Sequence, residues 1–140
     1  MRAKLRIPVP NAKQRQAMAA QEKYIAYGGA RGGGKSWFVR VKAVCMALEY
    51  PGIKILIVRR TYPELENNHI RPLREQLLGV AKYNEQKKRI QFPNGSAIKF
   101  GYCAAEKDMD QYQGAEFDLI FIDEATQIPE ERLVKFIPCL

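Results

Sequence analysis

The sequence predicts an α/β domain with a mainly parallel β-sheet, helices on both faces and one β-hairpin. Three observations support this fold class. A glycine-rich segment, residues 28–34, lies between a short apolar run and a helical pattern. Two later runs, 54–60 and 117–122, have continuous apolar centres, as parallel strands buried on both faces do. Strands and helices alternate along the chain, which is typical of α/β domains.

The first expected elements surround the glycine-rich segment. Pro8 and Pro10 exclude a helix at the start, and Asn11 is a suitable N-cap for a short helix ending near Gln21. A strand is expected over residues 24–27. After the glycines, apolar residues recur at the spacing of a helix, at Trp37, Val41, Val44, Cys45 and Leu48.

The turn signal at residues 50–52 ends that helix and leads into the strand at 54–60. A further helix is expected from Pro63 to about Leu78, and Pro72 should kink or interrupt it. The residues that share its apolar face are Leu65, His69, Ile70, Leu73 and Leu77. His69 has no neighbouring ligand set, so we interpret it as a surface histidine or a satisfied buried one.

The second half of the chain begins with a hairpin signal and ends in a helix. The expected elements are strands 89–92 and 97–102 joined by a turn at 93–95, a short helix over 106–112, a strand at 117–122, and a helix after Pro129. The chain stops at Leu140 within that last helix, where residues 136–140 would need an apolar partner that this chain lacks. We therefore expect a truncated protein or fragment with an incomplete sheet, whose turnover alone is doubtful.

Residues 29–36 fit the phosphate-binding pattern G-x-x-x-x-G-K-[ST]. Glycines let backbone N–H groups curl around phosphates at a helix N-terminus. Lys35 can reach the β- and γ-phosphates, and the Ser36 hydroxyl can bind Mg²⁺. The alternative is a glycine-rich turn that matches by chance, but the flanking strand and helix favour a nucleotide site. The predicted ATP contacts here are Gly29, Ala30, Arg31, Gly32, Gly33, Gly34, Lys35, Ser36 and Trp37.

The strand at 117–122 ends in an acid pair, Asp123 and Glu124. Asp123 would hold Mg²⁺ beside Ser36, and Glu124 would polarise the water that attacks the γ-phosphate. The alternative is a strand that ends in solvated acids. Together the two motifs predict a P-loop NTPase of the additional-strand catalytic-glutamate type, with a mainly parallel sheet sandwiched by helices.

Arg31, inside the glycine-rich loop, has three possible roles. It can act on the γ-phosphate as an arginine finger in cis, bind phosphate in the ground state, or point to solvent. We favour the γ-phosphate role, which would make Arg31 catalytic together with Lys35 and Glu124.

Composition and charge restrict the function classes. The 140 residues, with 46% hydrophobic and 27% charged side chains, suit one globular domain. No apolar run approaches the roughly 20 residues of a membrane helix, so no membrane partner is expected. The three cysteines form no C-x-x-C pair, which suits a reducing compartment. Residues 1–42 carry ten basic side chains and one acidic one, which suits DNA unless these side chains are merely solvated.

With both motifs placed, the chain resembles the ATPase domain of the large terminase subunit of tailed phages, the DNA-packaging motor. The likeness lies in four stretches that span residues 8–128. They are PNAKQ at 10–14, GGARGGGKS at 28–36, IVRRTYPEL at 57–65 and QGAEFDLIFIDEA at 113–125. The family's coupling motif and its nuclease domain are missing, so we expect residues 1–140 to be a partial N-terminal ATPase domain with no nuclease domain.

The resemblance implies a motor that uses ATP and Mg²⁺ to thread double-stranded DNA into an empty capsid in the cytoplasm of the infected bacterium. It implies the portal protein and the small terminase subunit as partners, and a homo-oligomeric ring. It places Gln14 at adenine, Arg31 as the γ-phosphate sensor and Glu124 as the catalytic base. The alternative for Gln14 is a surface glutamine on a polar helix.

Two other functions stay open on the sequence. The run Asp123-Glu124-Ala125-Thr126 superficially matches the acidic box of helicases, so a helicase-type DNA-dependent ATPase is one alternative. The other is a nucleotide-binding module without turnover, as a truncation remnant or a competitor of the intact subunit.

Overall fold

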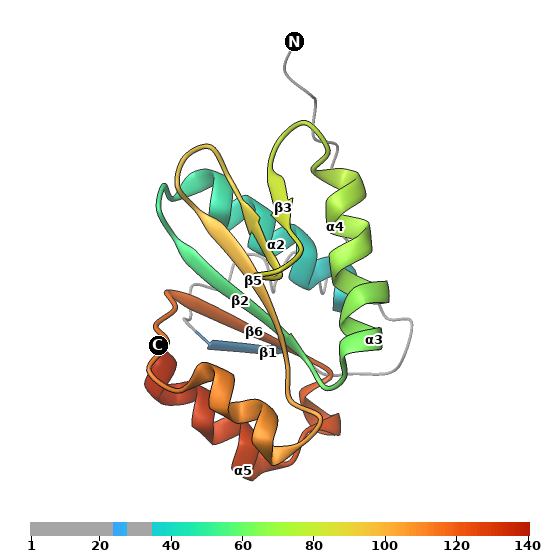
Figure 1. The fold of residues 1–140 in the computed structure, drawn as a ribbon, viewed down its shortest axis with the longest axis vertical. Coiled ribbons are helices and arrows are strands. Elements are labelled where there is room, and N and C mark those ends of the chain that lie inside the picture. The colour runs from blue at the N-terminus through green and yellow to red at the C-terminus, as the bar shows by residue number, and fades with distance from the viewer. Residues whose placement is uncertain (1–23, 28–34) are drawn as a thin grey trace.

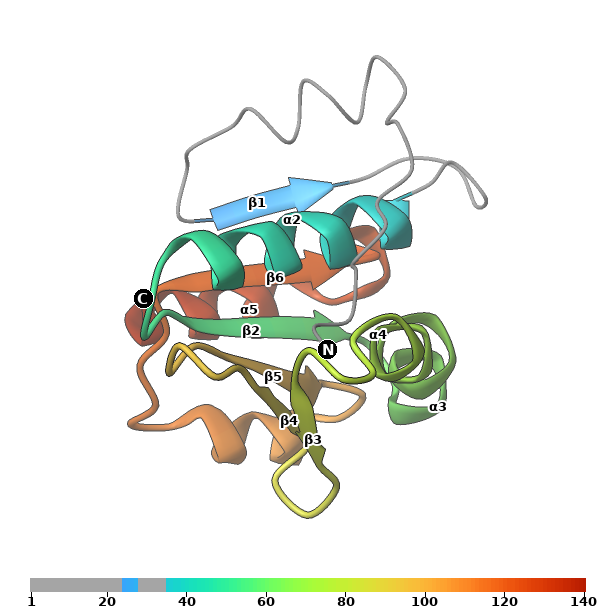
Figure 2. The ribbon, with the colours of Figure 1, turned by 90° about the horizontal axis from the view of Figure 1, so that it is seen from above.

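The computed structural model describes residues 24–27 and 35–140. Their strands form one six-stranded sheet in the order β1-β6-β2-β5-β4-β3, which Figure 2 shows from above. The strands are β1 (Tyr24–Tyr27), β2 (Lys54–Arg59), β3 (Lys82–Asn84), β4 (Arg89–Gln91), β5 (Ala97–Tyr102) and β6 (Leu119–Asp123). Strands β1, β6, β2 and β5 are parallel to one another, and β4 and β3 extend the sheet by antiparallel pairing. The predicted class, a mainly parallel α/β sheet with a hairpin, is confirmed.

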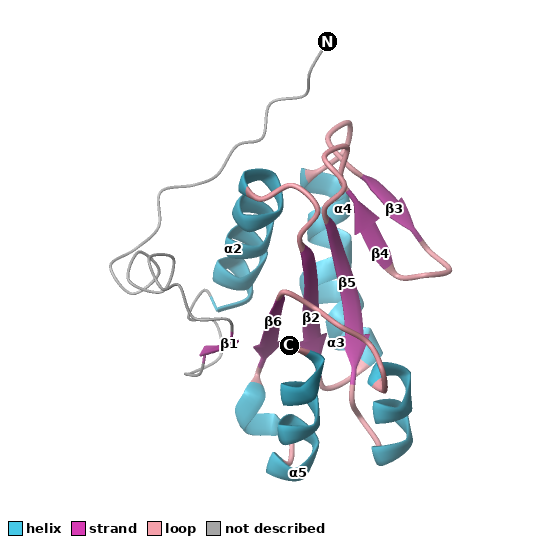
Figure 3. Ribbon diagram, turned by 90° about the vertical axis from the view of Figure 1, so that its left-hand side faces the viewer, coloured by secondary structure: helices cyan, strands magenta, loops and turns pink. Residues whose placement is uncertain are grey.

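Helices cover both faces of the sheet (Figures 1 and 3). One layer contains α2 (Lys35–Glu49), α3 (Tyr62–Leu65), the π-helical η1 (Glu66–Ile70) and α4 (Arg71–Gln76). The other contains the 3₁₀-helices η2 (Glu106–Tyr112), η3 (Ala125–Gln127) and η4 (Val134–Cys139), together with α5 (Glu130–Leu133). None of these helices is long and apolar enough to cross a membrane.

The two central strands supply both hydrophobic cores. In β2, Ile55 and Ile57 pack with α2 and the α3–α4 layer, whereas Leu56 and Val58 pack with η2 and η4. Strand β6 alternates in the same way, and all five of its residues are buried. Both faces therefore need apolar side chains, which explains why these strands have continuous rather than alternating apolar patterns.

The helix expected from Pro63 to Leu78 consists of three segments, and its π-helical turn ends at Ile70, two residues before Pro72. Pro72 has no N–H to donate to the carbonyl of Asn68, four residues earlier. That carbonyl accepts a hydrogen bond from Arg40 Nη1 instead. The predicted interruption is confirmed, and it takes the form of a widened turn, as π-bulges do.

Two parts of the expected fold were wrong. Strand β3 was not predicted, because its three residues contain only one partly buried side chain, Tyr83, between two exposed ones. The last helix, expected to be continuous after Pro129, is one α-helical turn followed by a 3₁₀-helix. Pro138 again has no N–H for the α-helical hydrogen bond.

The partner that the final residues require lies within the chain. Phe136 and Cys139 are buried in the second core, where the rings of Tyr112 and Phe136 are 4.8 Å apart. The expectation that all of residues 136–140 lack a partner was therefore wrong for these two. Ile137 and Leu140 remain exposed.

Candidate nucleotide and metal site

The carboxyl ends of three parallel strands meet at one edge of the sheet. Tyr27 at the end of β1 pairs with Asp123 at the end of β6, and Ile122 pairs with Val58 of β2. Helix α2 begins at Lys35, so the glycine-rich segment connects the end of β1 to the start of α2. Open α/β sheets bind their ligands at such an edge.

Part of the predicted site cannot be placed. Gln14, Gly29, Ala30, Arg31, Gly32, Gly33 and Gly34 lie outside the described residues, as does the side chain of Lys35. Their assigned contacts stay predictions. The described part of the site is built by Ser36, the β2 and β6 strand ends, and the α3–η1 segment.

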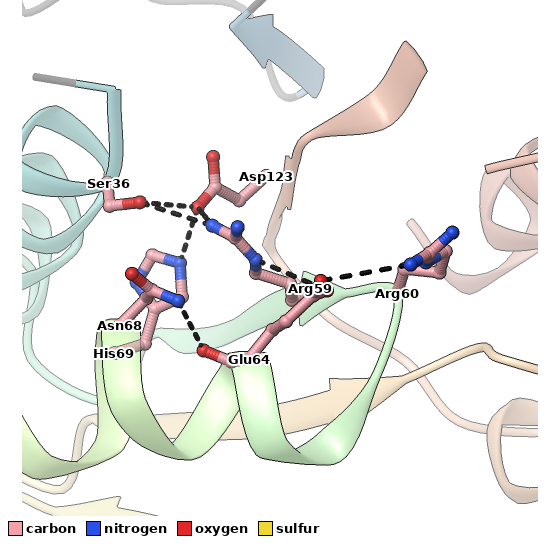
Figure 4. A network of polar contacts seen from close by, with 7 residues as sticks. All are labelled: Ser36, Arg59, Arg60, Glu64, Asn68, His69 and Asp123. Carbon is pink, nitrogen blue, oxygen red and sulfur yellow. Dashed lines mark hydrogen bonds and ion pairs between the residues drawn. The ribbon is translucent and has the colours of Figure 1, made fainter. Parts of the chain in front are cut away.

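Asp123 is the centre of this described part (Figure 4). Its side chain is fully buried, and Oδ2 accepts three hydrogen bonds. The donors are Ser36 Oγ at 2.8 Å, Arg59 Nη1 at 2.7 Å and His69 Nε2 at 2.7 Å. The structure thus brings together Ser36 and Asp123, which are 87 positions apart in the sequence.

This environment keeps Asp123 ionised. Burial by itself would raise the pKa of the carboxyl group, because a low-dielectric surrounding disfavours the charged form. The hydrogen bonds from His69 and Ser36 and the charge of Arg59 outweigh burial, so the pKa of Asp123 lies well below its ordinary value. The carboxylate is therefore available to a cation at any physiological pH.

His69 is a site residue that the sequence did not reveal. Its side chain is fully buried, with 0% of its surface accessible, so of the two interpretations the surface histidine was wrong. Burial lowers the pKa of His69 despite the neighbouring Asp123, which makes the imidazole neutral at pH 7. A neutral ring that meets a carboxylate through Nε2 carries its proton there and donates it.

We expect the pH dependence of stability to report this neutral His69. Because the folded-state pKa lies below the unfolded value, the unfolded chain binds a proton first as the pH drops through about 6.5. The free energy of unfolding should therefore fall as the pH is lowered, with a limiting slope of about 1.4 kcal/mol per pH unit.

Urea unfolding between pH 7.5 and 5.5, without metal or nucleotide, measures this slope. His69 is the only histidine in the chain, so the slope should nearly vanish in His69→Gln, which keeps a donor for Asp123. A slope that is equal in both proteins would contradict the assignment.

Arg59 is the second residue that was missed. It ends β2, its side chain is 12% exposed, and besides Asp123 it faces Glu64 of α3, with Nε 3.7 Å from Oε2. The position of Arg59 in the sequence could have indicated that it belongs to the site. Like Asp123, Arg59 follows a buried apolar run, and the ends of parallel strands lie at the same edge of a sheet.

Two further predicted residues are placed by the structure. Glu124 follows β6 directly and has left-handed backbone angles, φ 58° and ψ 42°, so the chain turns sharply after Asp123. It is partly buried at the site edge. Trp37 is partly buried as well and packs against the first hydrophobic core.

The donor set fits Mg²⁺. Asp123 Oδ1 is buried without a hydrogen-bond partner among the described residues, and Ser36 offers a hydroxyl oxygen beside it. Mg²⁺ takes oxygen ligands, and in nucleotide sites it uses one or two protein groups together with phosphates. No group of three His, Cys, Asp or Glu that could hold a metal occurs in the described part of the chain. With Ser36 and Asp123 as protein ligands, phosphate oxygens and water would complete the coordination of Mg²⁺.

A separate basic hollow lies on the hairpin side of the sheet. It has a volume of about 280 Å³ and is lined by Gln86, Lys87, Lys88, Arg89, Lys99, Phe100, Tyr102 and Gln111. Arg89 of β4 stands opposite Lys99 of β5. Like charges in this position repel each other.

The sheet order, the strand-end edge and the Ser36–Asp123 contact define an α/β domain of the P-loop NTPase fold. The chain belongs to the terminase large-subunit family: the model described as "Terminase large subunit, T4likevirus-type, N-terminal" matches residues 26–137. No curated protein sequence matches the chain.

Solved structures show the same fold. The large terminase of a thermophilic bacteriophage is 19% identical, with a TM-score of 0.75 over 91% of this chain and 35% of its own. The complex of that terminase with ADP gives a TM-score of 0.72 at 19% identity, with the same coverage of both chains. The large terminase ATPase domain of Thermus phage P74-26 is 20% identical, with a TM-score of 0.70 over 93% of this chain and 59% of its own. The chain thus covers 35% of the first of these relatives.

Proposed function

We propose that this chain is the ATP-hydrolysing motor domain of a phage terminase large subunit, which drives double-stranded DNA into a procapsid. The observation that carries the proposal is the 2.8 Å contact between Ser36 at the start of α2 and Asp123 at the end of β6. The family, the fold and the thermophilic phage terminase solved with ADP support it.

Each predicted residue has a role in this proposal. Ser36 and Asp123 hold Mg²⁺, which when bound neutralises charge on the phosphates. Lys35 and the backbone of 29–34 bind the phosphates, Arg31 contacts the γ-phosphate, and Gln14 contacts adenine. Glu124 orients and polarises the attacking water, because a carboxylate can accept its proton.

The first test is nucleotide binding. Lys35→Ala removes the charged hydrogen-bond donor for the phosphates, a contact of about 1.5–3 kcal/mol, so ATP affinity should fall by at least about tenfold. Calorimetry with ATP and Mg²⁺ measures it, and Lys107→Ala, an exposed lysine on η2, is the control with the same change of charge. Equal affinity in all three proteins would contradict the nucleotide site.

DNA is the proposed substrate of the motor, and the basic hollow is the described surface that best suits its phosphate backbone. Arg89 Nε is buried without a hydrogen-bond partner among the described residues, and Lys99 faces it across the strand pair. A phosphate group in the hollow would relieve the repulsion between Arg89 and Lys99. The basic residues of 1–23 lie outside the described residues and stay a second candidate.

We expect Lys87→Ala/Lys99→Ala to weaken binding to a DNA duplex of any sequence. Each lost phosphate contact should also reduce the slope of log K against log salt by about 1. Fluorescence anisotropy at several salt concentrations measures both effects. Lys54→Ala/Lys107→Ala, which removes two exposed lysines outside the hollow, should bind like the wild type, and an equal loss in both double variants would exclude a specific surface.

Portal protein, small terminase subunit and a ring of subunits are proposed partners on family grounds. A nucleotide-binding module without turnover is the alternative to the motor. Phosphate release separates the two candidates. Stimulation of that release by DNA supports the motor.

A further inference from the structure

The guanidinium of Arg59 contacts both groups that the proposed function assigns to Mg²⁺. Arg59 Nη1 is 2.7 Å from Asp123 Oδ2 and 3.3 Å from Ser36 Oγ. These oxygens belong to the two groups that the proposed function assigns to Mg²⁺. Figure 4 shows the guanidinium beside the Asp123 carboxylate, with dashed lines to Asp123 and Ser36.

A buried carboxylate needs a compensating positive charge. Asp123 is fully buried, and an ionised group in that position without a partner would be strongly destabilising. Arg59 supplies such a charge through its direct contact, with Nη1 2.7 Å from Asp123 Oδ2. A divalent cation on the same carboxylate would be a second positive charge a few ångströms from Arg59, and the two would repel each other.

Arg59 has a second acceptor within reach. Glu64 Oε2 is 3.7 Å from Arg59 Nε, and this Nε is buried without a hydrogen-bond partner among the described residues. The Glu64 side chain is one-third exposed, at 33%, and also pairs with Arg60 at 3.8 Å. A small shift of the guanidinium towards Glu64 would complete the hydrogen bonding of Nε and keep the arginine paired.

We propose that Arg59 is a positioning residue of the metal site. It holds Asp123 as a substitute cation in the nucleotide-free protein and yields to Mg²⁺ by moving onto Glu64. As a result Mg²⁺ alone binds poorly, and Mg²⁺ that arrives with nucleotide binds well because the phosphates add ligands. This inference rests on the proposed function, since it assumes a Mg²⁺–nucleotide site at Asp123.

Two substitutions with opposite expected effects test it. Arg59→Gln removes the competing cation, so Mg²⁺ without nucleotide should bind about tenfold more tightly than to the wild type, within the usual range of coupling between sites. Glu64→Gln weakens the second acceptor and leaves Arg59 on Asp123, so Mg²⁺–ADP should bind about fivefold more weakly. Arg60→Gln removes the neighbouring exposed arginine, which also pairs with Glu64, and should match the wild type in both titrations.

Calorimetric titration with MgCl₂, and with ADP at saturating Mg²⁺, measures these affinities, and thermal unfolding verifies that each variant is folded. Unchanged Mg²⁺ affinity in a folded Arg59→Gln, or unchanged Mg²⁺–ADP affinity in Glu64→Gln, overturns the inference. If Arg59→Gln does not fold, Glu64→Gln decides alone. If the wild type binds Mg²⁺–ADP and the variants bind it equally well, only the role of Arg59 is refuted. If the wild type does not bind Mg²⁺–ADP, the proposed function is refuted as well.

Discussion

Replacing Glu124 by glutamine is expected to leave ATP binding intact and to lower the rate of ATP cleavage by about 10²–10⁴-fold. Glutamine has the same shape but cannot accept a proton from water, and general-base catalysis contributes this order of magnitude. The substitution should not disturb the fold. The left-handed backbone at this position, φ 58°, is no less favourable for glutamine than for glutamate.

Rapid quench after mixing with radiolabelled ATP and Mg²⁺ separates binding from cleavage. Wild-type protein should contain ADP, whereas Glu124→Gln should retain intact ATP. Glu130→Gln, an exposed acid in the first turn of α5, is the matched control and should cleave at the wild-type rate. Equal cleavage by Glu124→Gln and the wild type would remove Glu124 from the role of base, and binding without cleavage by the wild type would favour the module without turnover.

The sheet could be predicted from sequence because its central strands are buried on both faces. Such strands need unbroken apolar runs, and the runs in β2 and β6 contain no competing helical pattern. The hairpin of β4 and β5 was predicted by alternation around Asn94 and Gly95, and the structure pairs these two strands antiparallel. Gly95 adopts φ 89°, a conformation that favours glycine.

The polar network at Asp123 could be predicted only in part. His69 shares the predicted apolar face with Leu65 and Leu73, but the sequence left open whether it is buried or lies on the surface. A buried imidazole requires a polar partner. Which partner it meets depends on how the α3–α4 layer lies over the strand ends, and this is a matter of tertiary packing. Arg59 was overlooked for a related reason, since an arginine at a strand end is equally compatible with solvent.

The interruption of the helix near Pro72 could also be predicted only in part. Pro72 predicted a break, but whether the chain kinks or widens depends on what satisfies the carbonyl of Asn68. Arg40 of α2 donates to that carbonyl, which allows the helix to continue as a π-turn. This turn places His69 over Asp123, so a proline and an arginine outside the motif help to shape the site.

Replacing Asp123 by alanine is expected to destabilise the folded protein by about 3–5 kcal/mol, because removing one member of a buried ion pair leaves the other without compensation. Arg59, with only 12% of its side chain exposed, would lose its direct contact with Asp123 and keep only Glu64 at 3.7 Å, and His69 would lose its acceptor. A small domain has a total stability of about 5–15 kcal/mol, so the loss would approach the limit of folding. Asp123→Asn keeps the shape and one acceptor oxygen, and we expect an intermediate loss.

Urea denaturation at several pH values measures the effect, with Asp110→Ala as the control, since Asp110 is exposed on η2. The pKa of Asp123 is lowered in the folded state, so its contribution is fully present above the unfolded pKa of about 3.9 and is lost as the pH falls further. The difference between wild type and Asp123→Ala should therefore be constant from about pH 6.5 to 8, and the part that the Asp123 carboxylate contributes should be lost only in strong acid. A difference no larger than that of Asp110→Ala would show that Arg59 and His69 find other partners, and that the buried carboxylate is kept for metal and nucleotide rather than for stability.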